Sequence, residues 1–167
     1  AGAVDRGPWT VEGSLFNGRE PDEHRWNLDL GPLDSVSGRV WFRPNAEWEF
    51  QASSGFLRNP EALEPEDVVR TTISGSWVRR QDADFTAVTA GYGVNRTDAD
   101  HHGSFFTEAT RRTGLNTAYG RFEAHEPEMS LLLTGQIPVT PQQSNLHGTL
   151  LALTVGGVRD VGRGRGL

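Results

Sequence analysis

WEFQASSGF, residues Trp48–Phe56, alternates apolar with polar side chains. Trp48, Phe50 and Phe56 fall on one side of an extended chain, and Glu49 and Gln51 fall on the other. A period of two residues is typical of a β-strand with one apolar face. The stretch therefore predicts a strand of about nine residues, which is long enough to cross a bilayer core when tilted.

The same alternation recurs along the chain and predicts a protein made of strands. Short and long connections alternate, so neighbouring strands are expected to pair antiparallel in a meander. The 20 glycines and 9 prolines suit many turns and few long helices. We predict about nine strands, with a tenth beginning near Leu167. The expected segments, besides 48–56, are 1–4, 9–16, 35–43, 69–77, 85–95, 104–110, 117–124 and 149–158.

The polar side of these strands contains charges of both signs at mid-strand, and a narrow polar lumen can satisfy such charges by pairing. The apolar side mixes Gly, Ala and Thr with larger residues, which lipid tolerates more easily than a close-packed core does. We therefore predict an all-β fold, an antiparallel meander β-barrel of the transmembrane outer-membrane type, as one domain over residues 1–167. The residues expected to line its lumen are Glu12, Arg39, Glu49, Arg70, Glu108, Arg121 and Glu123.

Aromatic residues flank the predicted short turns. Aromatic rings favour a membrane–water interface, where the apolar body and the polar edge are both satisfied. A ring of them at one end of a set of strands is the girdle expected of a transmembrane β-barrel. The pattern predicts a bacterial outer membrane of the Gram-negative type, with the lipid bilayer and lipopolysaccharide as partners. The predicted interface aromatics are Trp9, Trp41, Trp48, Trp77 and Phe85.

The bulk composition excludes several classes of protein. A hydrophobic fraction of 35%, a mean hydropathy of -0.51 and the absence of any run of 18 apolar residues exclude a helical membrane protein. The chain has no cysteine, which excludes disulfides and thiolate metal sites. A net charge of -6 argues against nucleic acid as a partner. No sequence motif indicates a cofactor.

The long connections are acidic and hold or adjoin all five histidines. Because long loops of outer-membrane barrels are extracellular, this pattern predicts an acidic mouth that attracts small cationic solutes. His24, His101 and His102 are weak candidates for metal ligands, since no spacing among them is a metal signature. Two alternatives remain open. In the first, the polar loops contain many histidine and acidic residues that do not come together at one site. In the second, divalent cations bridge loop carboxylates to lipopolysaccharide phosphates.

Two stretches, WTVEGSLFNGREPDE at residues 9–23 and GRVWFRP at residues 38–44, resemble uncharacterised, porin-like outer-membrane β-barrel proteins of GC-rich bacteria. The resemblance spans most of the chain and implies a barrel and an envelope location, but no activity or site residues. Members of such families usually continue past the point at which this chain stops. The chain also ends without a final amphipathic strand. We therefore expect a fragment, truncated at one or both ends.

These patterns predict a porin-like channel or a structural surface protein, not an enzyme. One alternative is a soluble all-β ligand-binding module with Trp41 and Trp48 as a platform. Another is a barrel-wall hydrolase, which needs a serine and a histidine within hydrogen-bond distance. No catalytic motif is present, and Ser74, Ser76 and Ser104 have no evident histidine partner at a neighbouring mid-strand position.

Overall fold

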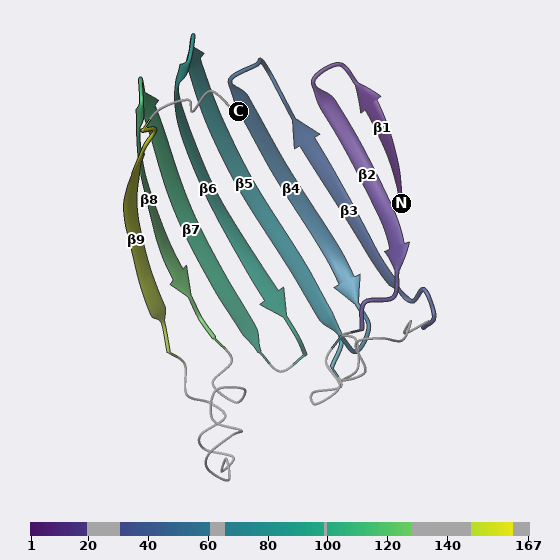
Figure 1. Cartoon of the computed structure of the whole chain (residues 1–167). Coiled ribbons are helices and arrows are strands. Elements are labelled where there is room, and N and C mark those ends of the chain that lie inside the picture. The colour runs from purple at the N-terminus through teal and green to yellow at the C-terminus, as the bar shows by residue number, and fades with distance from the viewer. Residues whose placement is uncertain (20–30, 61–65, 99, 128–147, 162–167) are drawn as a thin grey trace, which may run out of the picture.

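The protein folds as one antiparallel sheet of nine strands, in which each strand pairs with its neighbours in sequence (Figure 1). The computed structural model describes residues 1–19, 31–60, 66–98, 100–127 and 148–161. The all-β antiparallel meander predicted above is confirmed. Its strands are β1 (Gly2–Arg6), β2 (Trp9–Phe16), β3 (Ser35–Phe42), β4 (Trp48–Leu57), β5 (Val68–Gln81), β6 (Asp84–Arg96), β7 (His101–Thr113), β8 (Asn116–His125) and β9 (Leu150–Arg159).

Four tight connections join the strands at one end of the sheet (Figure 1). Three of them include a residue with positive φ: Gly7 at 59°, Asp82 at 54° and Gly114 at 59°. Such a backbone suits the twist of a two-residue hairpin, and glycine or aspartate adopts it readily. In the fourth, the side-chain oxygen of Asn45 accepts a hydrogen bond from the backbone N–H of Glu47 at 2.9 Å. The local turn chemistry therefore sets the antiparallel order.

The other four connections lie at the opposite end of the sheet (Figure 1). One of them is shorter than the sequence indicated, because β6 and β7 extend beyond their predicted ends. A backbone hydrogen bond from Thr97 N to Asp100 O, 2.9 Å long, closes this turn. The connections cover residues 17–34, 58–67, 97–100 and 126–149.

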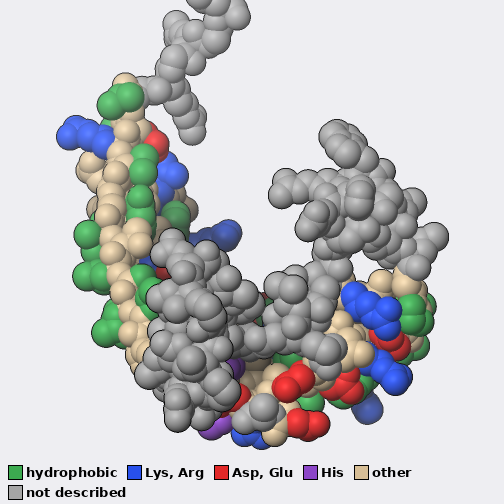
Figure 2. All heavy atoms as spheres, turned by 90° about the horizontal axis from the view of Figure 1, so that it is seen from below, with side chains coloured by type: hydrophobic (Ala, Val, Ile, Leu, Met, Phe, Trp, Pro, Cys, Tyr) green, Lys and Arg blue, Asp and Glu red, His purple; other side chains and the backbone are tan. Residues whose placement is uncertain are grey.

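The register gives the sheet two faces of different composition. One row across β2 to β5 aligns Val11, Val40, Ala52 and Ile73, and the adjacent row aligns Glu12, Arg39, Ser53 and Thr72. The sheet curves so strongly that it encloses a hollow on one side (Figure 2). We call the convex side, with the row of Val11, the outer face. The concave side, with the row of Glu12, is the inner face.

The sheet has no hydrophobic core among the residues that the structure describes. Large apolar side chains lie on its surface, including Ile73 at 56% exposure and Phe50 at 40%. The described sheet is open, with β1 and β9 as its two edges. Because the strands alternate in direction and are nine in number, β1 and β9 run the same way, so joining these edges directly would create a parallel pair. Closure into a barrel stays a prediction.

Within the described ranges, no helix has the length and apolar character needed to cross a membrane.

Candidate functional site: the two faces of the sheet

The outer face has a band without charge that crosses all nine strands. On β5 this band extends from Val69 to Trp77, with Arg79 just beyond it. Nine residues span about 27 Å along a strand, and a tilt of about 40° reduces this to roughly 21 Å. This height is close to the apolar band of about 25 Å on outer-membrane barrels. The charged or titratable side chains of the outer face lie at the strand ends: Arg6, Arg79, Asp84, Arg96, His101, Arg111 and Arg159.

Five aromatic rings form a continuous row on the outer face near the short turns, and we call this row the aromatic belt. Its ring centroids are separated by 4.4 Å for Trp9 and Phe42, and by 5.6 Å for Trp48 and Phe50. The distance is 6.3 Å for both Phe42–Phe50 and Trp48–Trp77. The indole nitrogen of Trp77 donates a hydrogen bond of 3.1 Å to a carboxylate in the adjacent turn. The Trp77 indole thus combines an apolar surface with a satisfied polar edge, as interfacial aromatics do.

The aromatic belt differs in membership from the predicted interface aromatics. Phe42, the last residue of β3, and Phe50 belong to it although neither was among the predicted interface aromatics. Trp41 and Phe85 lie on the inner face by register. Guanidinium carbons of two arginines lie 4.9 Å and 5.5 Å from the Trp41 ring centroid, so this ring takes part in cation–π contacts instead. Trp48 lies on the outer face, which excludes a shared platform of Trp41 and Trp48.

All seven residues predicted to line a lumen lie on the inner face. On β7 and β8 they form a tight cluster in which Arg121 donates to Glu108 at 3.1 Å and to Glu123 at 2.7 Å. The Arg121 guanidinium also lies 5.0 Å from the centroid of the Phe106 ring. One cation held between two carboxylates and a ring is fixed in position, because each contact restricts the same guanidinium plane.

The other predicted lumen residues lie apart from this cluster and contact single partners. Glu49 accepts a hydrogen bond of 2.6 Å from Arg43, whereas Glu12 and Arg39 approach only to 3.9 Å. The Nε of Arg70 donates to the side-chain oxygen of Asn95 at 2.8 Å. The inner face therefore combines a three-residue ionic cluster over β7–β8 with separate pairwise contacts over β2–β6.

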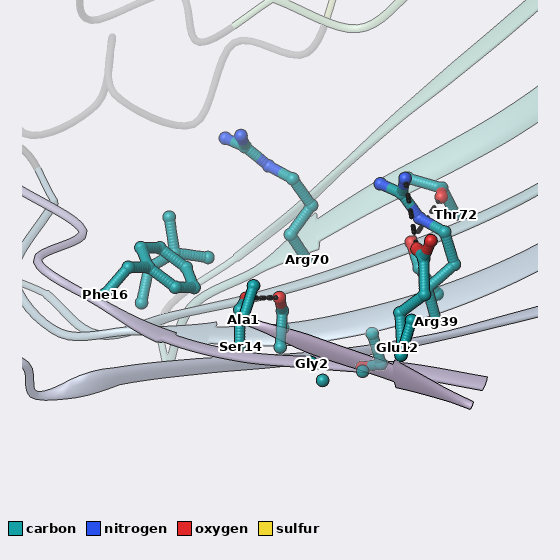
Figure 3. A pocket seen from close by; sticks show the side chains of 16 residues that line it. Ala1, Gly2, Glu12, Ser14, Phe16, Arg39, Arg70 and Thr72 are labelled. Carbon is teal, nitrogen blue, oxygen red and sulfur yellow. Dashed lines mark hydrogen bonds and ion pairs between the residues drawn. The ribbon is translucent and has the colours of Figure 1, made fainter.

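The inner face over β1 to β5 contains an open trough of about 630 Å³ (Figure 3). Its floor includes two hydroxyl pairs, Ser14–Ser37 and Ser53–Thr72, each with oxygens 2.8 Å apart. Arg70 extends from β5 into the open space of the trough (Figure 3). A hydroxyl donates once and accepts twice, so each pair retains hydrogen-bonding capacity for water or a polar solute.

Ser104 and His125 form a contact that the sequence did not indicate. They are register partners on β7 and β8, and the serine oxygen lies 2.5 Å from the Nδ1 atom of the imidazole. No histidine partner was expected for Ser104 at a neighbouring mid-strand position, and His125 is instead the last residue of β8. The tight turn at Gly114 sets the pairing of the two strands and so brings the two residues together.

Of the histidine candidates for a metal site, His101 and His102 lie among the described residues. His101 and His102 are consecutive on β7 and so point to opposite faces. Both imidazoles lie near the same carboxylate, that of Asp100, with nitrogen–oxygen distances of 4.0 Å for His101 and 3.8 Å for His102. Over the described ranges, no three His, Cys, Asp or Glu side chains could hold a metal ion together. His24 lies outside the described residues.

The predicted acidic mouth is described only in part. Asp98, Asp100 and Glu126 lie in the connections opposite the short turns, as do Glu66 and Asp67. Outside the described residues are Glu20, Asp22, Glu23, Glu61, Glu64 and Glu128.

Comparison with protein-family models, curated proteins and solved structures gives no match to this chain. The resemblance to porin-like outer-membrane proteins consequently stays a prediction.

Proposed function

We propose that this chain forms the wall of an outer-membrane β-barrel of a Gram-negative bacterium, with its outer face in lipid and its inner face toward a polar lumen. The observation that supports this most strongly is the charge-free, exposed band on the outer face of all nine strands. Contiguous apolar surface of this extent needs a cover, because soluble monomers rarely expose patches larger than a few hundred Å².

Lipid fits this surface better than a packed protein layer. The band includes Gly75, Ala90 and Thr107 in one row across β5 to β7, and such small side chains leave an uneven surface. Fluid acyl chains adapt to that surface, whereas a second sheet requires close packing. The aromatic belt lies at one border of the band, where an interfacial girdle is expected.

The activity we propose is that of a porin-like channel with a preference for small cations. Ion pairing neutralises much of the inner-face charge, so the acidic end opposite the short turns is expected to set the selectivity. If the lumen is filled, the same barrel acts as a structural surface protein with lipopolysaccharide as a neighbour.

The proposal is tested by reconstitution into vesicles and planar bilayers. The protein should resist extraction by alkaline carbonate and should give cation-selective conductance steps. Membrane insertion without conductance indicates the structural protein. A polypeptide that remains in solution without detergent supports the soluble alternative and contradicts the proposal.

A second candidate function, hydrolysis at the wall, is favoured by the contact between Ser104 and His125. An imidazole at this distance can accept the serine proton and activate the oxygen as a nucleophile. A fluorophosphonate probe should then label Ser104 and fail to label the Ser104→Ala variant. Ser76, which is hydrogen-bonded to Thr89 at 3.1 Å, provides the matched control, because Ser76→Ala should not affect labelling. Absence of labelling in the folded protein removes this candidate.

A further inference from the structure

In the part of the chain that the structure describes, four arginines lie on the outer face next to the short-turn end of the sheet. They are Arg6 on β1, Arg79 on β5, Arg111 on β7 and Arg159 on β9. Among the described residues, none of the four pairs with a carboxylate. Like charges placed on one face at the same end of a sheet repel each other unless an anion lies between them.

Arg79 and Arg111 have the clearest geometry for sharing such an anion. They occupy one outer-face row, with Thr86 between them on β6. Two strand spacings separate their backbones by roughly 10 Å, so two long side chains can converge on one group between them. The nearest outer-face acid is Asp84, whose carboxylate already accepts a hydrogen bond of 2.7 Å from the backbone N–H of Gly114.

The position of this row identifies the anion. Trp77 is two residues before Arg79 on the same face, so the arginines lie just beyond the aromatic belt. In a membrane that level corresponds to the lipid headgroups. Guanidinium groups bind phosphate oxygens in a bidentate manner, and their aliphatic stems can lie along acyl chains. We propose that the outward arginines bind the headgroup phosphates of anionic phospholipids in the leaflet next to the short turns. This inference rests on the proposed membrane location.

The chain provides a matched control for this inference. Arg80 is the next residue on β5 and lies on the inner face by register, opposite Phe85. Arg79→Gln and Arg80→Gln therefore remove the same charge from adjacent positions on opposite faces. Of these two variants, only Arg79→Gln should weaken the preference for anionic lipid. The expected loss is about fivefold, which is the effect of removing one arginine near the membrane surface. The double variant Arg79→Gln/Arg111→Gln should lose more than either single variant.

The experiment uses the full chain in phosphatidylcholine vesicles that contain equal mole fractions of brominated phosphatidylglycerol or brominated phosphatidylcholine. Quenching of tryptophan fluorescence reports which lipid lies against the aromatic belt. Stronger quenching by brominated phosphatidylglycerol, reduced by Arg79→Gln and unchanged by Arg80→Gln, supports the inference. Equal quenching by the two lipids, or equal effects of the two variants, overturns it while leaving the membrane location intact. Absence of quenching by either lipid contradicts the proposed function itself.

Discussion

Residues of the outer face and of the inner face alternate along β5, so two consecutive residues have different surroundings. The outer face presents Val69, Thr71 and Ile73, whereas the inner face presents Arg70 and Thr72. Inner-face polar groups have partners, such as Thr72 with Ser53 at 2.8 Å, while outer-face residues such as Ile73 remain 56% exposed. The difference indicates that polar side chains of the inner face find hydrogen-bond partners within the sheet. The apolar side chains of the outer face are removed from water only if something covers the convex side.

The largest expected effect comes from placing a charge on each face in turn. Ile73 lies at the centre of the charge-free band, and Ser74 is its neighbour on the inner face. We expect Ile73→Arg to lower the free energy of unfolding in vesicles by about 2–4 kcal/mol, as arginine does at the lipid-facing midplane of a barrel. Urea titration of the folded protein in vesicles measures this loss.

Ser74→Arg is the matched control, because it adds the same side chain to a polar, hydrated face. It should alter the free energy of unfolding only slightly, by within about 0.5 kcal/mol. Equal losses in the two variants would show that the faces do not differ in their surroundings.

An intermediate effect is expected in the aromatic belt. A double-mutant cycle on Trp48→Ala and Phe50→Ala should give a coupling free energy of about 0.5–1.5 kcal/mol, since the two rings stack at 5.6 Å. The same cycle on Trp41→Ala and Phe50→Ala should give a coupling near zero, because Trp41 lies on the opposite face. A similar coupling in both cycles is the outcome that contradicts this assignment of faces.

The smallest effect is expected in the ionic cluster of the inner face. Arg121→Gln should lower the urea midpoint, because it leaves Glu108 and Glu123 as like charges on adjacent strands. Adding Glu123→Gln should restore part of the loss by removing that repulsion, and high salt should reduce the difference by screening. If the second substitution lowers the midpoint further, the cluster is not held by charge.

Strand positions and faces were predictable from the sequence because alternation is a local property. The predicted strand at 9–16 coincides with β2 at both ends. Membership of the aromatic belt was not predictable to the same degree. Phe42 and Phe50 are eight residues apart, and only the register across β3 and β4 makes them neighbours.

The contact between Ser104 and His125 was missed for a related reason. Ser104 lies nine residues before Thr113, and His125 lies nine residues after Asn116. The two are therefore register partners once the two-residue turn is placed correctly. The predicted strands ended at residue 110 and resumed at residue 117, which left the register undefined. Gly114 was the available turn signal. Closure depends on edge strands far apart in sequence, so local alternation does not determine it.

The central claim, that the outer face contacts lipid, is tested most directly by nitroxide scanning of residues 70–75 on β5 in vesicles. The chain has no cysteine, so each introduced cysteine provides a unique label. We predict an alternation of period two: labels at Thr71 and Ile73 are accessible to oxygen, and labels at Thr72 and Ser74 are accessible to a water-soluble nickel chelate. Labels at Thr71 and Ile73 that are immobile and inaccessible to both reagents would indicate a packed protein interior and contradict it.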